Sequence, residues 1–334
     1  MDEYYLHLFD VTQPDLNWDN EEVRKEVQKI VRFWMKKGVK GFRFDVVNLI
    51  SKSDYLDDYE GDGRRFYTDG PNIHKYLREL NDNSFGQDVE IVTVGEMSST
   101  TMENCFKYAG ADSHELSMVF SFHHLKTDFA GNEKWVLVPN DFMKLKRILF
   151  DWQTGMAENN AWNAVFWCNH DQPRVVSRFG DEGQYWKESA KMLATIIHCM
   201  RGTPYIYQGE EIGMTNHGFT DISQYRDVES LNHFEILQKK GLTQADAYRI
   251  LQVHSRDNGR TPMQKASSPI QILSFPIIRS LFVSEKKWIS SHMAISDQLM
   301  RSILLYLLTK ESITEKSYWL YAISIAMKFH GIVE

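Results

Sequence analysis

Residues 19–45, DNEEVRKEVQKIVRFWMKKGVKGFRFD, contain the pattern that decides the fold. The first part predicts a helix over residues 19–38, because apolar side chains recur there at helical spacing: Val23, Val27, Ile30, Val31 and Trp34. Residues 39–45 follow at once and predict a buried strand that ends in Asp45. A helix that leads directly into a strand is typical of parallel α/β folds, in which such units repeat.

The same alternation repeats along the chain. A helix at about 73–80 precedes a strand at 89–94, and further strands are predicted at 116–122, 164–167 and 203–207, the last two joined by a long helix over about 187–200. This pattern predicts a parallel sheet, and closure into a barrel is one solution. A complete (β/α)8 barrel has eight strands, so we expect a partial barrel whose first three strands would precede Met1.

Bulk composition narrows the function classes. The chain has 334 residues and a net charge of −7, which argues against a general nucleic-acid binder. Its apolar runs are too short to span a membrane, and its acidic N-terminus has no apolar signal segment. The cysteines Cys105, Cys168 and Cys199 match no zinc or redox spacing. We therefore expect a cytoplasmic protein with no metal, no cofactor and no membrane partner.

Polar residues stand at the carboxyl ends of the predicted strands: Asp45, Glu96, 169–171 and 208–211. In α/β barrels the chemistry lies at this end, where the strand ends meet. A carboxylate at the end of a buried strand is costly unless it has a partner or a function. One such residue can equally be structural, but several at one edge indicate a site.

Two of these carboxyl groups fit the chemistry of glycosidic bond hydrolysis. A retaining glycosidase needs a nucleophile and an acid/base whose carboxyl groups lie roughly 5 Å apart. Period-two geometry places Arg43 on the same face of its strand as Asp45, where its charge would keep Asp45 ionised as a nucleophile requires. Glu96 has apolar neighbours, and desolvation favours the protonated form that an acid needs.

The motifs around these residues resemble those of a known family. GFRFD (41–45), VGEM (94–97) and NHDQPR (169–174) resemble three signature motifs of glycoside hydrolase family 13, the α-amylase family, and QPDLN (13–17) resembles a motif of its oligo-1,6-glucosidase branch. The resemblance implies a (β/α)8 barrel of which this chain holds about strands 4 to 8. It also implies a set of roles: Asp45 as nucleophile, Glu96 as acid/base, Asp171 as transition-state stabiliser, Arg43 and His170 as contacts to the nucleophile and the sugar, and Arg256 as either a sugar contact or a structural ion pair.

Further strings resemble the members of this branch that hydrolyse trehalose 6-phosphate: 5–10, 62–71, 122–126 and 166–171. This resemblance implies hydrolysis of trehalose 6-phosphate to glucose and glucose 6-phosphate. Arg64, Arg65 and Lys126 are candidate phosphate contacts, because a sugar phosphate is a dianion and arginine binds phosphate bidentately. They can equally be solvated surface cations. Hydrolysis of neutral oligosaccharides, as by an oligo-1,6-glucosidase, is the alternative substrate class.

The chain also departs from the family pattern. The family's first motif, the first three strands and the inserted domain are absent, and the resemblance stops at Gln264. Residues 265–334 contain one glycine and five acidic residues, so the turn chemistry of a β domain is missing. We expect a partial catalytic barrel over 1–264 and a non-homologous, frameshifted tail over 265–334. A catalytically inactive fragment is a further alternative, whereas a non-catalytic transporter subunit fits poorly with three retained carboxylates.

Overall fold

The computed structural model describes residues 4–53, 61 and 63–263 of the chain. These residues divide into two compact units, each of which is described by itself. The first unit contains Met1–Lys126, Asp151–Phe166 and Arg201–Tyr205, and the second contains Thr127–Phe150, Trp167–Met200 and the described part of Ile206–Glu334. The predicted tail over 265–334 lies outside the described residues.

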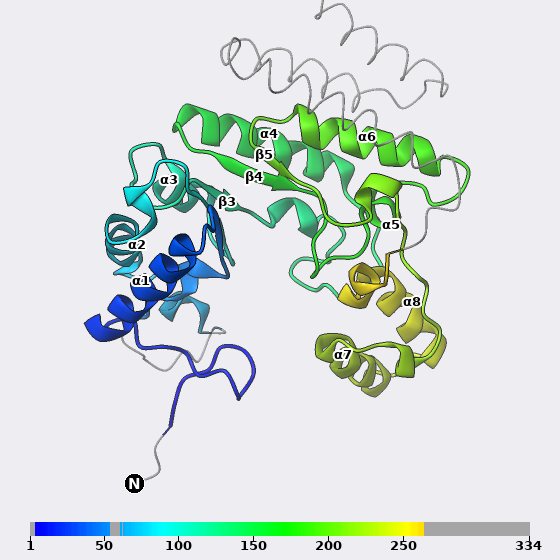
Figure 1. Cartoon of the computed structure of the whole chain (residues 1–334). Helices are drawn as coiled ribbons and strands as arrows, with labels where there is room; N and C mark the ends of the chain where they lie inside the picture. The colour runs from blue at the N-terminus through cyan, green and yellow to red at the C-terminus, as the bar shows by residue number, and fades with distance from the viewer. Residues whose placement is uncertain (1–3, 54–60, 62, 264–334) are drawn as a thin grey trace, which may run out of the picture. The chain divides into compact units, whose positions relative to one another are not determined.

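All five strands of the described chain belong to the first unit and form one parallel sheet (Figure 1). They are β1 (Gly41–Phe44), β2 (Val92–Glu96), β3 (Met118–Phe120), β4 (Asn163–Phe166) and β5 (Thr203–Tyr205). Neighbours in the sheet are neighbours in sequence order, β1-β2-β3-β4-β5, and every pair is parallel. Sequential parallel strands joined through helices are the arrangement of a (β/α)8 barrel. The predicted fold class, a partial barrel of this type, is therefore confirmed.

Helices cover one face of the first strands. Figure 1 draws α1 (Glu21–Lys36), α2 (Ile73–Asp82) and α3 (Met102–Ala109) beside β1 to β3. Their apolar sides meet in one core that includes Val31, Leu77 and Cys105 together with Val119 of β3. The other face of the sheet carries a smaller apolar cluster around Val94, Met118 and Ala164. The polar strand ends are thus supported by packed side chains on both faces of the sheet.

The predicted helices agree with the structure, whereas several predicted strands are longer than the observed ones: 116–122 is Met118–Phe120 and 203–207 is Thr203–Tyr205. The helix predicted over 19–38 is α1, which begins after Asn20, whose side chain accepts a hydrogen bond from the Glu22 N–H at 3.0 Å. The strand predicted at 89–94 is wrong at its start, because β2 begins at Val92. Val89 is fully exposed in a turn that Asp88 closes by accepting from the Glu90 N–H. The helices at 102–109, 142–158, 175–179, 228–239 and 244–254 were not predicted.

The second unit is mainly helical. Its helices are α5 (Val175–Phe179), α6 (Trp186–Cys199), α7 (Val228–Lys239) and α8 (Gln244–His254), and α4 (Phe142–Glu158) begins in this unit and ends in the first. Helices α7 and α8 pack together through a core that includes Phe234, Leu237 and Leu251. Short 3₁₀ turns complete the two units: η1 (Val47–Leu49), η2 (Arg64–Phe66), η3 (Phe85–Gln87), η4 (His123–Lys126), η5 (Glu210–Ile212), η6 (Ile222–Gln224) and η7 (Arg256–Arg260).

A buried ion pair joins two segments of the second unit. The Arg178 guanidinium donates to both carboxylate oxygens of Asp128, at 2.9 and 2.7 Å, and both side chains are 3% exposed. Arg178 also donates to the side chain of Gln172 at 2.7 Å. The segment after β4 is thereby anchored next to Asp171.

Across the described ranges, no helix is long and apolar enough to cross a bilayer.

Gly70 is a packing constraint in the loop between β1 and α2, and it yields a stability prediction. A Cβ at Gly70 would lie 2.1 Å from the Ser51 carbonyl oxygen, which cannot move as a side chain would. Gly70→Ala should lower the free energy of unfolding by about 1–3 kcal/mol or more, measured by chemical denaturation. Gly41→Ala is the control, because a Cβ there would meet only the Val92 oxygen at 3.7 Å. Equal stabilities of the two variants would contradict this packing account.

Candidate active site

Parallel pairing brings the first two predicted carboxylates to neighbouring strand ends. In the register of β1 and β2, Arg43 faces Val94 and Phe44 faces Gly95. One residue further, the same register carries Asp45 next to Glu96. Neighbouring strands lie about 4.8 Å apart, and a retaining glycosidase needs carboxyl groups about 5 Å apart. The sheet geometry alone therefore suits these two residues to that reaction.

Arg43 connects the two carboxylates. Its guanidinium donates to Asp45 Oδ1 through Nη1 at 2.7 Å and to Glu96 Oε2 through Nη2. Arg43 and Asp45 lie on the same face of β1, as the period-two spacing predicts, while Phe42 and Phe44 pack into the core on the other face. Asp45 is 72% exposed and Glu96 is 11% exposed. One carboxylate is thus open to a substrate and the other is largely shielded from water.

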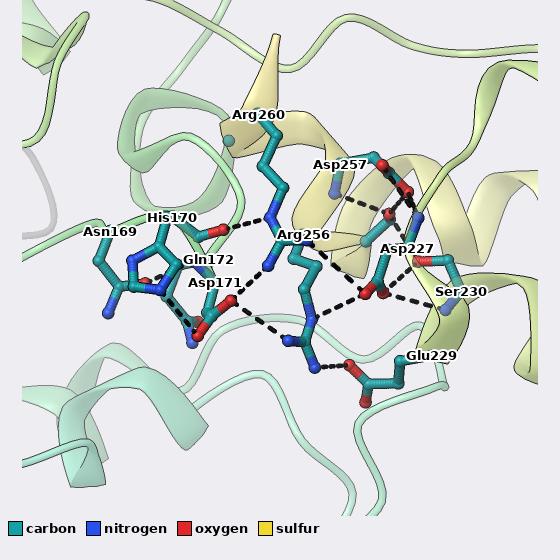
Figure 2. Close-up of polar contacts among 12 residues, drawn as sticks. Asn169, His170, Asp171, Gln172, Asp227, Glu229, Ser230, Arg256, Asp257 and Arg260 are labelled. Carbon is teal, nitrogen blue, oxygen red and sulfur yellow. Dashed lines mark hydrogen bonds and ion pairs between the residues drawn. The ribbon is translucent and has the colours of Figure 1, made fainter. Parts of the chain in front are cut away.

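Asp171 belongs to the second unit, where two arginines hold it (Figure 2). Arg260 donates to Asp171 Oδ1 at 2.6 Å, and Arg256 donates to the same oxygen at 3.2 Å. His170 Nε2 lies 3.4 Å from the other carboxylate oxygen, and the Asp171 N–H donates to Asn169 Oδ1 at 2.8 Å. The side chain of Asp171 is 31% exposed, so it keeps a solvent-facing surface while its charge is balanced.

Arg256 is the centre of this network. Besides Asp171, it contacts Asp227 at 3.2 Å and Glu229 at 2.9 Å, as Figure 2 shows. Burial alone would lower the pKa of Arg256, but the carboxylates of Glu229, Asp227 and Asp171 outweigh it and raise the pKa. Asp227 also caps α7 by accepting from the Ser230 N–H. The structure therefore gives Arg256 the ion-pair role that the sequence left as one of two alternatives.

The loop of η7 must approach the Asp171 loop closely. A Cβ at Gly259 would lie 2.5 Å from the Gln172 carbonyl oxygen and 3.2 Å from that of Asn169. Arg260 Nε donates to the His170 carbonyl oxygen at 2.8 Å. The glycine lets the backbones touch, and Arg260 then fixes the approach with hydrogen bonds to both His170 and Asp171.

The candidate phosphate contacts lie in the first unit. Arg64 and Arg65 form η2 and are exposed, and Arg64 donates to Ser99 Oγ at 3.4 Å. Lys126 ends η4 and is partly buried. Burial lowers the pKa of Lys126, and the positive charge of Arg64 lowers it further. The structure thus brings Arg64 and Lys126 into one positive region, although they are far apart in sequence.

Sequence reasoning missed several residues around these sites. Arg260 could have been noticed, because it lies four residues after Arg256 with one glycine between them. Asp227 and Glu229 gave no signal in the sequence. Asp227 directly precedes α7 and Glu229 lies in its first turn, 56 and 58 residues after Asp171. Asn48 and Asp69, which join the loops after β1 and β2, were also missed. Within the described ranges, no group of three or more His, Cys, Asp or Glu is arranged to hold a metal ion.

The predicted polar segment after β5 contains a carboxyl group in an apolar setting. Glu210 keeps some exposed surface as a residue, yet its Oε1 atom is buried and has no hydrogen-bond partner. Burial raises the pKa of this carboxyl from its ordinary 4.5 to about 8, and the neighbouring Glu211 carboxylate adds to the increase. Glu210 is therefore mainly a neutral acid near pH 7.

The ion-pair network yields a stability prediction. Arg256→Ala would leave Asp171, Asp227 and Glu229 with fewer positive partners, and Asp227 is 7% exposed. We expect a loss of about 1–2 kcal/mol in the free energy of unfolding of the second unit, measured by urea denaturation. Arg249→Ala is the matched control, because its pair with Asp246 is largely exposed and should contribute little. A loss no larger than that of the control would show that the network is not stabilising.

Glu210 yields a pH prediction. Between pH 4.5 and about 8, the folded chain holds a proton on Glu210 that the unfolded chain releases, so this residue makes stability fall as pH rises through that window. Glu210→Gln keeps the shape and removes the titration. The variant should therefore gain in melting temperature over the parent as pH is raised from 5 to 8, by roughly a few degrees. Parallel melting curves at every pH would refute the buried-acid assignment.

Comparison with known proteins identifies the family. The family model described as the catalytic domain of α-amylase matches residues 1–271. The chain is 62% identical over 263 residues to a trehalose-6-phosphate hydrolase of Bacillus subtilis (strain 168), covering 78% of this chain and 47% of that protein. It is 49% identical over 270 residues to an oligo-1,6-glucosidase of Bacillus cereus, covering 79% of this chain and 48% of that protein.

A solved structure agrees with these relatives. The trehalose-6-phosphate hydrolase of Bacillus licheniformis superimposes with a TM-score of 0.76 at 51% identity, covering 90% of this chain and 57% of that one. The chain spans about half the length of the curated relatives that it matches. Because the family model matches most of its residues, the chain belongs to the α-amylase family of glycoside hydrolases, as part of the catalytic domain.

Proposed function

We propose that this chain carries the catalytic carboxylates of a retaining α-glycoside hydrolase. The observation that carries the proposal is the single guanidinium of Arg43, which contacts both Asp45 and Glu96 at adjacent strand ends. Asp45 is the nucleophile: it is exposed, and the guanidinium of Arg43 contacts its carboxylate. Glu96 protonates the leaving oxygen and later activates water. Glu96 is largely shielded from water, and this shielding supports its role as a residue that donates and accepts a proton.

Asp171 is proposed to stabilise the positive charge that develops on the sugar ring. Its carboxylate forms ion pairs with Arg256 and Arg260 and keeps exposed surface toward solvent. His170 is more than half exposed and lies beside it, which suits a hydrogen bond to a sugar hydroxyl. Arg256 has its guanidinium engaged by three carboxylates. We therefore propose that it acts by holding Asp171, with any sugar contact secondary.

The proposed substrate is trehalose 6-phosphate, hydrolysed to glucose and glucose 6-phosphate. Two lines of support agree. The identity to a relative named trehalose-6-phosphate hydrolase is 62%, against 49% for one named oligo-1,6-glucosidase. In addition, Arg64 and Lys126 lie close enough for one charge to lower the pKa of the other, and a dianion would relieve that repulsion.

The alternative within the class is hydrolysis of neutral α-glucosides, which a 49% identical oligo-1,6-glucosidase keeps open. Because the chain spans about half of these relatives, an inactive fragment is the other alternative. We further propose that residues 1–264 are the partial catalytic barrel, that 265–334 are a non-homologous tail, and that the protein is cytoplasmic.

The direct test is hydrolysis of trehalose 6-phosphate and isomaltose by the purified chain, with Asp45→Asn as the blank. Release of glucose 6-phosphate by the chain and not by the blank supports the proposal. Hydrolysis of isomaltose alone would favour the neutral-substrate alternative. Hydrolysis of neither would favour the inactive fragment.

The arginine pair of η2 yields a specificity prediction. In an active form, Arg64→Ala with Arg65→Ala should raise KM for trehalose 6-phosphate at least tenfold, because a hydrogen bond to a charged group contributes about 1.5–3 kcal/mol. The kcat should change less, since the phosphate is remote from the breaking bond. Hydrolysis of isomaltose by the same variant is the internal control and should be nearly unchanged. Equal loss of both activities would make the arginines structural.

A further inference from the structure

The loops that follow β1 and β2 are joined by one buried amide. Asn48 lies three residues after Asp45 and is 0% exposed. Its Oδ1 accepts from the Ser98 N–H at 2.9 Å, and its Nδ2 donates to the Ser98 carbonyl oxygen at 2.8 Å. Ser98 lies two residues after Glu96. The side chain of Asn48 thus pairs with both polar groups of Ser98 and extends the β1–β2 pairing beyond the end of the strands.

Asp69 ties the same loops to a helix. Its carboxylate accepts four hydrogen bonds from uncharged side chains: Asn48 Nδ2 at 3.1 Å, Tyr108 OH at 2.6 Å, Thr100 Oγ1 at 2.7 Å and Asn104 Nδ2 at 2.8 Å. The Asp69 N–H also donates to the Asn48 carbonyl oxygen at 2.9 Å. Because Tyr108 and Asn104 lie on α3, both loops are fixed to the helix that packs behind the sheet.

The backbone around this cluster is held in an unfavourable conformation. Three residues other than glycine have positive φ angles here: Val46 at 33°, Asp69 at 50° and Ser99 at 53°. Val46 directly follows Asp45, and a positive φ is a true outlier for a β-branched residue. Such strain costs about 1–3 kcal/mol per residue and persists only where surrounding contacts enforce it. The contacts of Asn48 and Asp69 are the ones that lie next to all three positions.

We propose that Asn48 and Asp69 are positioning residues that set the separation and orientation of Asp45 and Glu96. We call Asn48, Asp69, Ser98, Thr100, Asn104 and Tyr108 the carboxylate clamp. Arg43 contacts both carboxylates, but it is a long side chain on β1 alone and cannot fix the loop after β2. The clamp does so through partly buried hydrogen bonds of 2.6–3.1 Å that reach Ser98 and Thr100. This inference rests on the proposed function for its catalytic meaning, although the clamp itself is independent of any substrate.

The test compares Asn48→Ala and Asp69→Asn with the parent chain by two measurements. The first is the titration of the Asp45 and Glu96 carboxyl carbons by ¹³C NMR, assigned with Asp45→Asn and Glu96→Gln. The second is kcat and KM for whichever of trehalose 6-phosphate and isomaltose the chain hydrolyses. Asn81→Ala is the matched control, because its amide donates to the Glu115 backbone at 3.0 Å, away from the strand ends. Tyr108→Phe, which removes one donor to Asp69, is the milder variant should Asn48→Ala fail to fold.

If the clamp positions the carboxylates, at least one of the two titration curves should differ from that of the parent in Asn48→Ala and Asp69→Asn, since the contacts with Arg43 change. The titrations of Asn81→Ala should match the parent. In an active chain, kcat should fall about tenfold to a hundredfold while KM changes little. Unchanged titrations in folded variants, or an unchanged kcat, would overturn the proposal. A parent chain that hydrolyses neither sugar would refute the proposed function, and the titrations would still decide on the clamp.

Discussion

The contact of one guanidinium with two carboxylates is the interaction on which the site in the first unit depends. Asp45 and Glu96 stand at the ends of adjacent parallel strands, and without Arg43 between them their like charges would repel each other. Arg43 can reach both because it lies two residues before Asp45 on the same face of β1. Parallel pairing then places Glu96 beside that face. Register and side-chain alternation therefore bring the three groups together, and the proposed carboxylate clamp then holds the loops that follow β1 and β2.

Because the site follows from strand register and side-chain alternation, the sequence could predict part of it. The Arg43–Asp45 contact is local and has period two, so the sequence GFRFD was sufficient to predict it. The parallel sheet followed from helix–strand alternation, and the motifs gave the family. The boundary of β2 was missed because Val89 and Ile91 suggest a strand, whereas Asp88 closes a turn there. Propensity is weaker than such local side-chain hydrogen bonds.

The ion-pair network around Asp171 could not be predicted in the same way. Arg256 and Glu229 lie 85 and 58 residues from Asp171 in sequence, and no period relates them. The sequence shows only that these residues are charged, and charged residues are usually solvated at the surface. Their role in the network depends on their being partly or fully buried in the fold. Asp227 caps α7 and forms an ion pair with Arg256 at the same time, so the start of that helix and the orientation of Asp171 share one set of contacts. The resemblance named Arg256 as important, and the structure supplies the reason.

The two carboxylate sites use cations differently from the positive region of Arg64 and Lys126. At Asp45, Glu96 and Asp171, arginine charges are matched by carboxylates within the same unit, so each group is stable before any substrate arrives. Near Lys126, burial and the charge of Arg64 both oppose the ammonium form. A neutral sugar would leave the pKa of Lys126 lowered, whereas the negative charge of a phosphate dianion would raise it. Under the proposed function, this response of Lys126 to a bound phosphate would contribute to selectivity for the phosphorylated sugar. Because Arg64 is exposed, this selectivity should weaken as salt screens its charge.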